Sequence, residues 1–135
     1  MTGKARRLPD WVDDIREAIH NIRTDIGAAT ECEFLADGKT LRAVTKGIAD
    51  IGEAANQIMQ VTPGLAQANP DSWAHLKRVY AMRNVLSHGY FRTDASVVWD
   101  TVNNHLPKLE KLLDGILLEA DGGNNVSDCG PVLCP

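Results

Sequence analysis

Apolar residues between Leu8 and Ile26 recur at steps of three and four, which places them along one side of a helix. Pro9 suits the first turn of such a helix, because its missing N–H would have no helical partner there. Gly27 follows the last apolar position and is a natural helix stop. The pattern therefore predicts an amphipathic helix over residues 8–26. Its apolar positions are Leu8, Trp11, Val12, Ile15, Ile19, Ile22 and Ile26.

A second apolar stripe covers residues 41–58, again with steps of three and four. Asp37 or Thr40 can cap its exposed N–H groups, and Pro63 ends the helix. We expect this to be the longest helix of the chain. Residues 28–38, which lie between the first two helices, have no clear period and are predicted to form a connector.

Two further helices are predicted in the second half of the chain. One begins near Ser72 and loosens over Ser87–Gly89, and the other carries an apolar stripe over residues 98–116. Pro107 falls inside this last stripe. Because proline removes a backbone donor and clashes with the carbonyl four residues earlier, we expect a kink near residues 103–106.

The absence of strand-like alternation predicts an all-α protein, an up-and-down bundle of four to five helices. A chain of 135 residues is long enough for one domain with a core of its own. From Asp121 the sequence turns to Gly, Asn, Ser, Asp and Pro without a period. We therefore expect a helical domain over residues 1–120 and a disordered tail over residues 121–135.

Fourteen basic residues against eighteen acidic ones give a formal net charge of −4. Binding of nucleic acid by bulk electrostatics needs a strongly basic surface, so any contact with nucleic acid must be local. No apolar run approaches the roughly 18 residues of a membrane span, and we expect a cytoplasmic protein with no membrane partner. Cys32, Cys129 and Cys134 form an odd set without a CxxC pair and are predicted to be free thiols.

The segment R-N-V-L-S-H-G-Y, residues 83–90, concentrates several polar functions in a short stretch. Arg83 is a permanent cation that can donate two hydrogen bonds to one phosphate. His88 carries an imidazole, a group with a reference pKa near 6.5 that can exchange protons at neutral pH. Spacing alone also fits an ordinary helix end, with an arginine in a surface ion pair and a glycine cap.

This segment, extended to Phe91, resembles the R-x-x-x-x-H-x-Y motif of the HepT-like HEPN family, the toxin ribonucleases of prokaryotic toxin–antitoxin pairs. The I-G-E-A sequence at residues 51–54 is similar to a segment on the long helix of that family. Similar residues also flank the motif, and the likeness covers roughly residues 8–118. The flanking residues are Trp73, Asp94, Val98, Trp99, Leu106 and Pro107.

The resemblance implies a metal-independent endoribonuclease without a cofactor, a homodimer in which Arg83 and His88 of both subunits face one cleft. Cleavage of RNA at its own 2′-hydroxyl needs a base, an acid and a cation on the phosphate. A two-fold axis offers two histidines for the two proton transfers. Asn84 can orient the phosphate or His88, or simply cap the helix. Glu53 lies near the apolar stripe and can pair with Arg83 or another cation, because a charge near the core is costly without a partner.

The basic residues Lys77, Arg78 and Arg92 flank the motif and can form a local positive rim for RNA, or an ordinary solvated helix face. In the family that the sequence resembles, the antitoxin is a minimal nucleotidyltransferase that transfers AMP to the tyrosine of the motif. Tyr90 matches that position. An AMP group there would occlude the approach of a substrate phosphate to Arg83. Outward packing of the Tyr90 ring is the alternative.

Other functions stay open at this point. Glu17 and His20 have the Glu-x-x-His spacing of di-iron bundles, but such sites need a second pair, and a solvent-facing pair is expected. The Cys129 and Cys134 spacing matches no common metal site. A non-catalytic helical module that binds a nucleotidyltransferase partner or a nucleotide would fit the acidic charge better. The presence of both an arginine and a histidine in the motif favours the ribonuclease.

Overall fold

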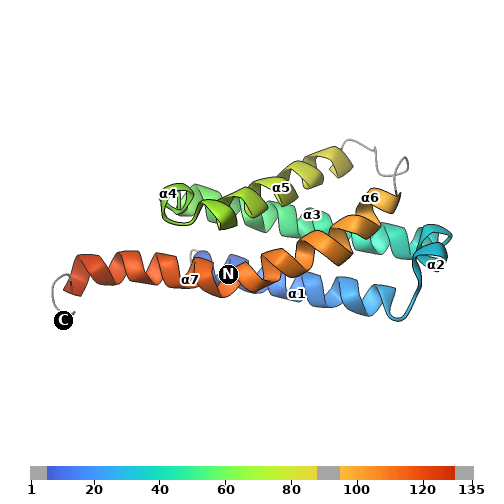
Figure 1. Ribbon diagram of the computed structural model, residues 1–135, viewed down its shortest axis with the longest axis horizontal. Coiled ribbons are helices and arrows are strands. Elements are labelled where there is room, and N and C mark those ends of the chain that lie inside the picture. The colour runs from blue at the N-terminus through green and yellow to red at the C-terminus, as the bar shows by residue number, and fades with distance from the viewer. Residues whose placement is uncertain (1–5, 88–94, 130–135) are drawn as a thin grey trace.

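The computed structural model describes residues 6–87 and 95–129, with the backbone alone for Ser87 and residues 120–129. Within these residues the chain is all-α and has no strand, which confirms the predicted fold class. Four long helical segments run antiparallel, each opposite to the one before (Figure 1). They are α1 (Leu8–Ile26), α3 (Gly38–Val61), α5 (Pro70–Ser87), and the continuous run of α6 (Ala95–Asp100), the π-helix η2 (Thr101–His105) and α7 (Leu106–Cys129).

Two connectors contain short helices that the sequence analysis missed, α2 (Glu31–Leu35) and α4 (Leu65–Ala68), so the expected number of four to five helices is too low. At α2 the Thr30 hydroxyl accepts a hydrogen bond from the Glu33 backbone N–H, and the Glu33 carboxylate accepts one from the Thr30 N–H. This reciprocal capping stabilises a single helical turn. Phe34 anchors that turn, because its ring is buried and the centroid of its ring lies 5.2 Å from the centroid of the Trp99 ring.

The predicted ends of the first two long helices are largely confirmed. Gly27 ends α1 in the left-handed region, with a φ of 58°, where a Cβ atom would be strained. Asp37 caps α3 and accepts a hydrogen bond from the Thr40 N–H. The two helices α3 and α7 both have 24 residues, so α3 is not the longest alone.

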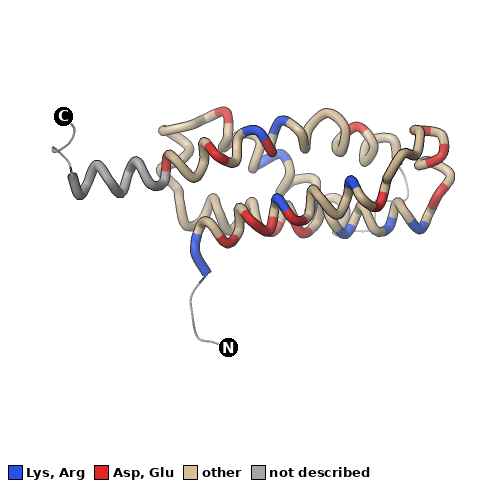
Figure 2. Tube along the Cα trace, turned by 90° about the horizontal axis from the view of Figure 1, so that it is seen from below, with Lys and Arg blue, Asp and Glu red and all other residues tan. Residues whose placement is uncertain are grey.

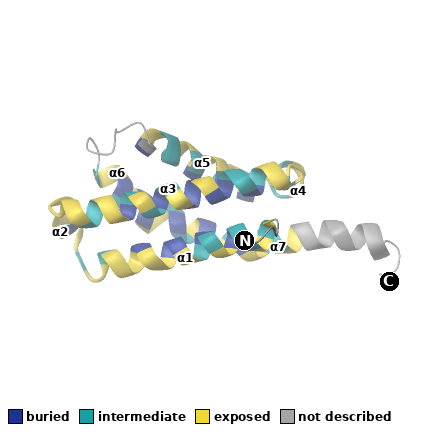
Figure 3. Ribbon diagram, turned by 180° about the vertical axis from the view of Figure 1, so that it is seen from behind, coloured by how far each residue is buried: buried dark blue, intermediate teal, exposed yellow. Residues whose placement is uncertain are grey.

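The core lies between the four long segments, and the buried residues face inward (Figure 3). Helix α3 packs against both α1 and α5, and α7 contacts both α1 and α5, which closes the bundle. The apolar stripes predicted from the sequence supply this core, and Ile15, Val44, Ile48 and Leu113 are fully buried. The periodicity of the sequence therefore predicts which side of each helix is buried.

Pro107 is accommodated by a π-helical turn. The Leu106 N–H donates to the Thr101 carbonyl, five residues earlier. Pro107 has no N–H to offer to the Asn103 carbonyl, so the α-helical pattern cannot continue through this point. The predicted irregularity occurs where it was expected, and its form is a widened turn.

The C-terminal segment departs from the prediction. Helix α7 continues to Cys129, so the backbone of residues 121–129 is helical where a disordered tail is expected. Extending a helix that already packs on the core costs far less free energy than nucleating a new helix. The amino-acid composition of residues 121–129 does not contain this information. The division of the chain at residue 120 stays a prediction, and residues 130–135 lie outside the described part.

Basic and acidic residues are interspersed along the helices of the bundle (Figure 2). Two ion pairs connect α1 to α7: Arg16 lies 2.7 Å from Asp114, and Arg23 makes two hydrogen bonds to Glu110, of 2.7 and 3.2 Å. They are exposed and contribute modestly to stability. Among the described helices, none combines the length and the apolar character needed to cross a membrane.

Candidate active site

Three residues predicted for the site lie together where α5 packs against α3. The Nη2 atom of Arg83 lies 3.3 Å from Oε1 of Glu53, and its Nη1 donates to Oδ1 of Asn84 at 3.0 Å. About a third of the Arg83 side chain, 34%, is exposed. The carboxylate and the amide therefore hold the guanidinium in one direction and leave it within reach of solvent.

Gly52 explains why the Arg83 side chain lies so close to α3. A Cβ atom built on Gly52 would be 2.3 Å from the Arg83 Cβ and 2.9 Å from the Val79 carbonyl oxygen. Such contacts are far shorter than van der Waals distances, so α5 can approach to this distance only because residue 52 is glycine. The glycine and the glutamate of the I-G-E-A segment thus act on the same arginine.

Gln57 is a further member of this cluster, and the sequence analysis did not identify it. Its side-chain amide donates to Oε2 of Glu53 at 3.3 Å, one helical turn along α3. Glu53 therefore interacts through both carboxylate oxygens, one with Arg83 and one with Gln57. Gln57 follows Glu53 by four residues, a spacing that places both side chains on one face of a helix, and this spacing indicates the contact in the sequence.

The remaining residues of the predicted motif lie outside the described residues. These are His88, Tyr90 and Arg92, of which His88 comes directly after Ser87, the last residue of α5. The roles assigned to these three residues stay predictions.

The predicted basic rim is only partly within the described chain, and its members do not all face Arg83. Lys77 and Arg78 are both exposed on α5. Arg78 interacts with His105 of the π-helical turn, with 3.1 Å between Nη1 and Nδ1. Five residues separate Arg78 from Arg83, which is about 140° around an α-helix. The two arginines therefore lie on different sides of α5.

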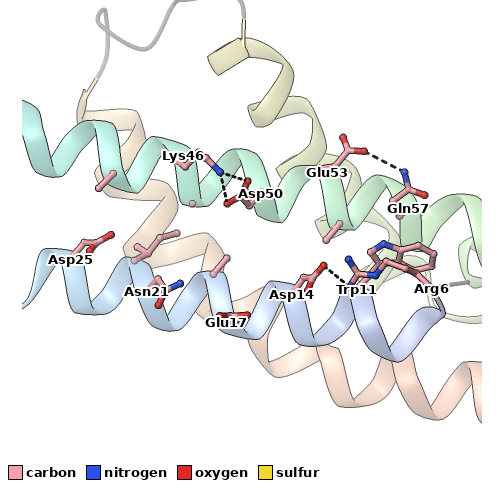
Figure 4. A pocket seen from close by; sticks show the side chains of 15 residues that line it. Arg6, Trp11, Asp14, Glu17, Asn21, Asp25, Lys46, Asp50, Glu53 and Gln57 are labelled. Atoms are coloured by element: carbon pink, nitrogen blue, oxygen red, sulfur yellow. Dashed lines mark hydrogen bonds and ion pairs between the residues drawn. The ribbon is translucent and has the colours of Figure 1, made fainter. Parts of the chain in front are cut away.

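A wide groove of about 870 Å³ lies between α1 and α3 (Figure 4). Its charged lining is mainly acidic, and its two cations, Arg6 and Lys46, are 2.9 and 3.0 Å from Asp14 and Asp50. Glu53 also lines it. A groove with this charge repels phosphate, so it is not the surface on which RNA is expected to lie. The acidic lining residues are Asp14, Glu17, Asp25, Asp50 and Glu53.

Metal ligation has no candidate cluster within the part of the chain that the structure describes, since no three His, Cys, Asp or Glu side chains converge. Glu17 lines the groove and His20 is exposed. Cys134 lies outside the described residues, and the side chain of Cys129 is not among those described.

Comparison with known proteins gives the family. Residues 15–116 match the family model described as ribonuclease HepT-like. The chain belongs to the HepT-like ribonuclease family. The matched residues of this HepT-like chain extend from α1 into α7 and include the whole of the 83–90 motif.

Relatives of this HepT-like chain support the same assignment. The protein named "Probable ribonuclease HepT" of Thermococcus cleftensis is 36% identical over 105 residues, which cover 78% of this chain and 91% of the relative. A "Putative RNase" of Methanocaldococcus jannaschii is 30% identical over 109 residues, 81% of this chain and 86% of the relative. No solved structure gives a significant match.

Proposed function

We propose that this HepT-like chain is a metal-independent endoribonuclease and the toxin of a toxin–antitoxin pair. The observation that carries the proposal is the position of Arg83. The absence of a side chain at Gly52 lets Arg83 lie close to α3, and Glu53 and Asn84 orient its guanidinium. This arginine stands five residues before His88 in the motif. A cation held in a fixed direction beside a proton-exchanging group is what phosphodiester cleavage requires.

The proposed reaction uses the 2′-hydroxyl of the RNA itself. One His88 removes the hydroxyl proton, O2′ forms a bond to phosphorus, and the bond from phosphorus to O5′ breaks. A second His88, from the other subunit of a homodimer, gives its proton to the leaving oxygen. The products are a 2′,3′-cyclic phosphate and a 5′-hydroxyl. Arg83 stabilises the negative charge that develops on the phosphate oxygens.

Lys77, Arg78 and Arg92 are proposed to bind the RNA strand outside this site, with Arg78 on a different side of α5 from Arg83. The acidic groove between α1 and α3 supports a local rather than a bulk mode of RNA binding, because most of that face would repel phosphate. Contacts by a few cations position a strand without the need for a basic protein.

Removal of either central side chain tests the proposal. We expect His88→Ala to lower RNA cleavage by about 10²–10⁴-fold in the presence of EDTA, the typical contribution of a positioned acid or base. Arg83→Ala is expected to lose about 10²–10³-fold, as when a donor to a developing oxyanion is removed. Cleavage is measured on a labelled single-stranded RNA, with circular dichroism as the check of folding. Arg16→Ala, which removes a partly exposed arginine on α1, is the matched control. Full activity in His88→Ala would contradict the mechanism.

Tyr90 is the proposed point of control by the antitoxin. Transfer of AMP to its phenol by a minimal nucleotidyltransferase would place a phosphate and a nucleoside where the substrate approaches Arg83. After co-expression with such an enzyme, we expect intact-mass spectra to show gains of whole AMP units, together with loss of cleavage. The gain should vanish in Tyr90→Phe and persist in Tyr80→Phe, the matched change at the other tyrosine. An inhibited complex with unmodified Tyr90 would instead indicate steric neutralisation.

A second function is favoured by one observation, the acidic lining of the α1 and α3 groove. A helical module that only binds a nucleotidyltransferase or another basic partner would need such a surface and no proton transfer. Wild-type protein that binds the transferase but cuts no RNA in any tested ionic condition would support this alternative.

A further inference from the structure

A small apolar slot lies on the side of α5 that carries Arg78, between α5, α6 and the π-helical turn. Its volume is about 100 Å³, which corresponds to about three water molecules at roughly 30 Å³ each. The slot is therefore large enough for a single ring and too small for a whole cofactor. Its apolar walls are Val79, Met82, Val97, Leu106 and Leu109.

Polar side chains line the same slot and form a connected chain. His105 lies between Arg78 and Asp100. Its Nδ1 is 3.1 Å from Nη1 of Arg78, and its Nε2 is 3.3 Å from Oδ2 of Asp100. A guanidinium only donates, so Nδ1 accepts and the ring proton is on Nε2, which faces the carboxylate. The Asn104 amide donates to the other carboxylate oxygen. Asp100 thus orients His105, and His105 orients Arg78.

The π-helical turn is what makes this chain of contacts possible. In an α-helix, residues five apart point about 140° away from each other, so Asp100 and His105 would face different directions. A π-helical turn is wider and closes with a bond between residues five apart, which brings such a pair onto one side. Turns of this kind are rare and are frequent at functional sites. The irregularity that Pro107 imposes therefore assembles a polar cluster beside the slot.

Arg78 is oriented without being neutralised. Among the described residues its hydrogen-bond partner is an imidazole nitrogen, and no carboxylate lies within ion-pair distance of its guanidinium. The Asp100 carboxylate is engaged by His105 and Asn104. His75, the other imidazole of the slot, is 3.9 Å from Asp71. An exposed guanidinium held in one direction matches the geometry of a phosphate group.

We propose that this slot binds one unpaired nucleotide of the RNA substrate, with the base between the apolar walls and the phosphate on Arg78. The inference rests on the proposed ribonuclease function. Proteins recognise single-stranded RNA by taking unstacked bases into pockets or onto planar groups, and by contacting the phosphates. Arg78 and Arg83 are about 7.5 Å apart along the axis of α5. Because the two arginines also lie on different sides of α5, about 140° apart, a strand bound at Arg83 has to pass around this helix to reach the slot.

The test measures the affinity of the full chain for a short single-stranded RNA whose 2′-hydroxyls are methylated, so that it binds without being cut. Val97→Phe fills the slot from its exposed edge, and Arg78→Gln removes the cation. Each is expected to weaken binding about tenfold, the size of effect that loss of one base contact has in single-strand binding. Val61→Phe, at another exposed valine, on α3, and Lys111→Gln, at an exposed lysine on α7, should bind within about twofold of wild type.

The outcomes separate this proposal from the ribonuclease assignment. If Val97→Phe and Arg78→Gln bind the RNA as tightly as their controls, the slot is not a nucleotide site, even if the wild-type protein cuts RNA. Weakened binding in these two variants would support the slot even if no RNA is cut, and the proposed function would then fail alone. UMP, whose base is a single ring, is added as a competitor: displacement of the RNA shows that the slot also accepts free nucleotides. If the free nucleotide does not displace the RNA, while Val97→Phe and Arg78→Gln still weaken RNA binding, the slot binds a nucleotide only as part of an RNA strand.

Discussion

At the scale of single residues, Gly52 determines how close Arg83 comes to α3. A methyl group at this position would collide with the Arg83 Cβ and with the backbone of α5. We expect Gly52→Ala to lower the free energy of unfolding by about 1–3 kcal/mol, the usual cost of overpacking. We also expect RNA cleavage to fall by about 10²-fold, because a displacement of about 1 Å in a positioning group has effects of that size. Chemical denaturation and a cleavage assay measure the two effects.

Gly115→Ala is the matched control for this prediction. A Cβ atom at Gly115 would meet a single atom, the Asn69 amide nitrogen, at 3.8 Å, which is an ordinary contact. The substitution should raise stability by about 0.5–1 kcal/mol, since alanine is the better helix former, and it should leave cleavage unchanged. Equal behaviour of the two alanine variants would show that the close approach at Gly52 does not position Arg83.

The sequence predicts a cation as the partner of Glu53, with Arg83 as one candidate, and does not predict what surrounds the pair. In the structure the partner is Arg83, and Glu53 is exposed, with 48% of its side chain accessible, rather than close to the core. The close approach at Gly52 depends on the distance between two helices, which no local pattern contains. The same holds for the contact between Arg78 and His105, residues 27 positions apart in the chain.

At the scale of helices, Asp37 shows how one side chain sets the start of an element. Its carboxylate accepts hydrogen bonds from the Thr40 hydroxyl at 2.7 Å and from the Thr40 N–H at 3.1 Å, and these bonds lower the pKa of Asp37. A carboxylate with a lowered pKa in the folded state adds stability above its unfolded pKa of about 3.9. That contribution is lost as the pH falls through the folded-state pKa.

Thermal unfolding of Asp37 variants tests this cap. At pH 7 we expect Asp37→Ala to have a Tm lower than wild type by about a few degrees, because the first N–H groups of α3 lose their acceptor. The difference should narrow as the pH is lowered from about 4 through the lower pKa of the folded state, where the wild-type carboxylate becomes protonated. Asp37→Asn keeps a side-chain acceptor and should stay close to wild type at pH 7. A Tm difference that does not change with pH would rule out the ionised cap.

The positions of helices can be predicted where the apolar periodicity extends over several turns, and cannot be predicted in this way where a helix has a single turn. The stripes of α1, α3 and α7 extend over several turns and predict both the helices and their buried sides. The single turn of α2 has no periodicity, and the T-x-x-E pattern at Thr30 was its signal. At Pro107 the sequence predicts that the α-helix is interrupted, but a kink and a π-helical turn both relieve the missing donor. Packing of the surrounding helices decides between them.

At the scale of the whole molecule, the proposed chemistry requires more than one chain, because each chain has one histidine in the motif and the reaction has two proton transfers. If both histidines of a homodimer act in one cleft, a dimer with a single His88 is inactive. Mixing wild-type and His88→Ala chains by co-refolding then gives activity that follows the square of the wild-type fraction. An equal mixture should retain about a quarter of the wild-type activity rather than about half.

The matched mixture uses Arg16→Ala in place of His88→Ala, which leaves every cleft complete and should keep full activity at all ratios. Light scattering at the assay concentration establishes the oligomeric state in the same samples. A linear dependence on the wild-type fraction would mean that each chain carries a complete site, and a monomer that cuts RNA would mean the same. Either result would remove the shared cleft and require the second proton transfer to come from water or from another group of the same chain.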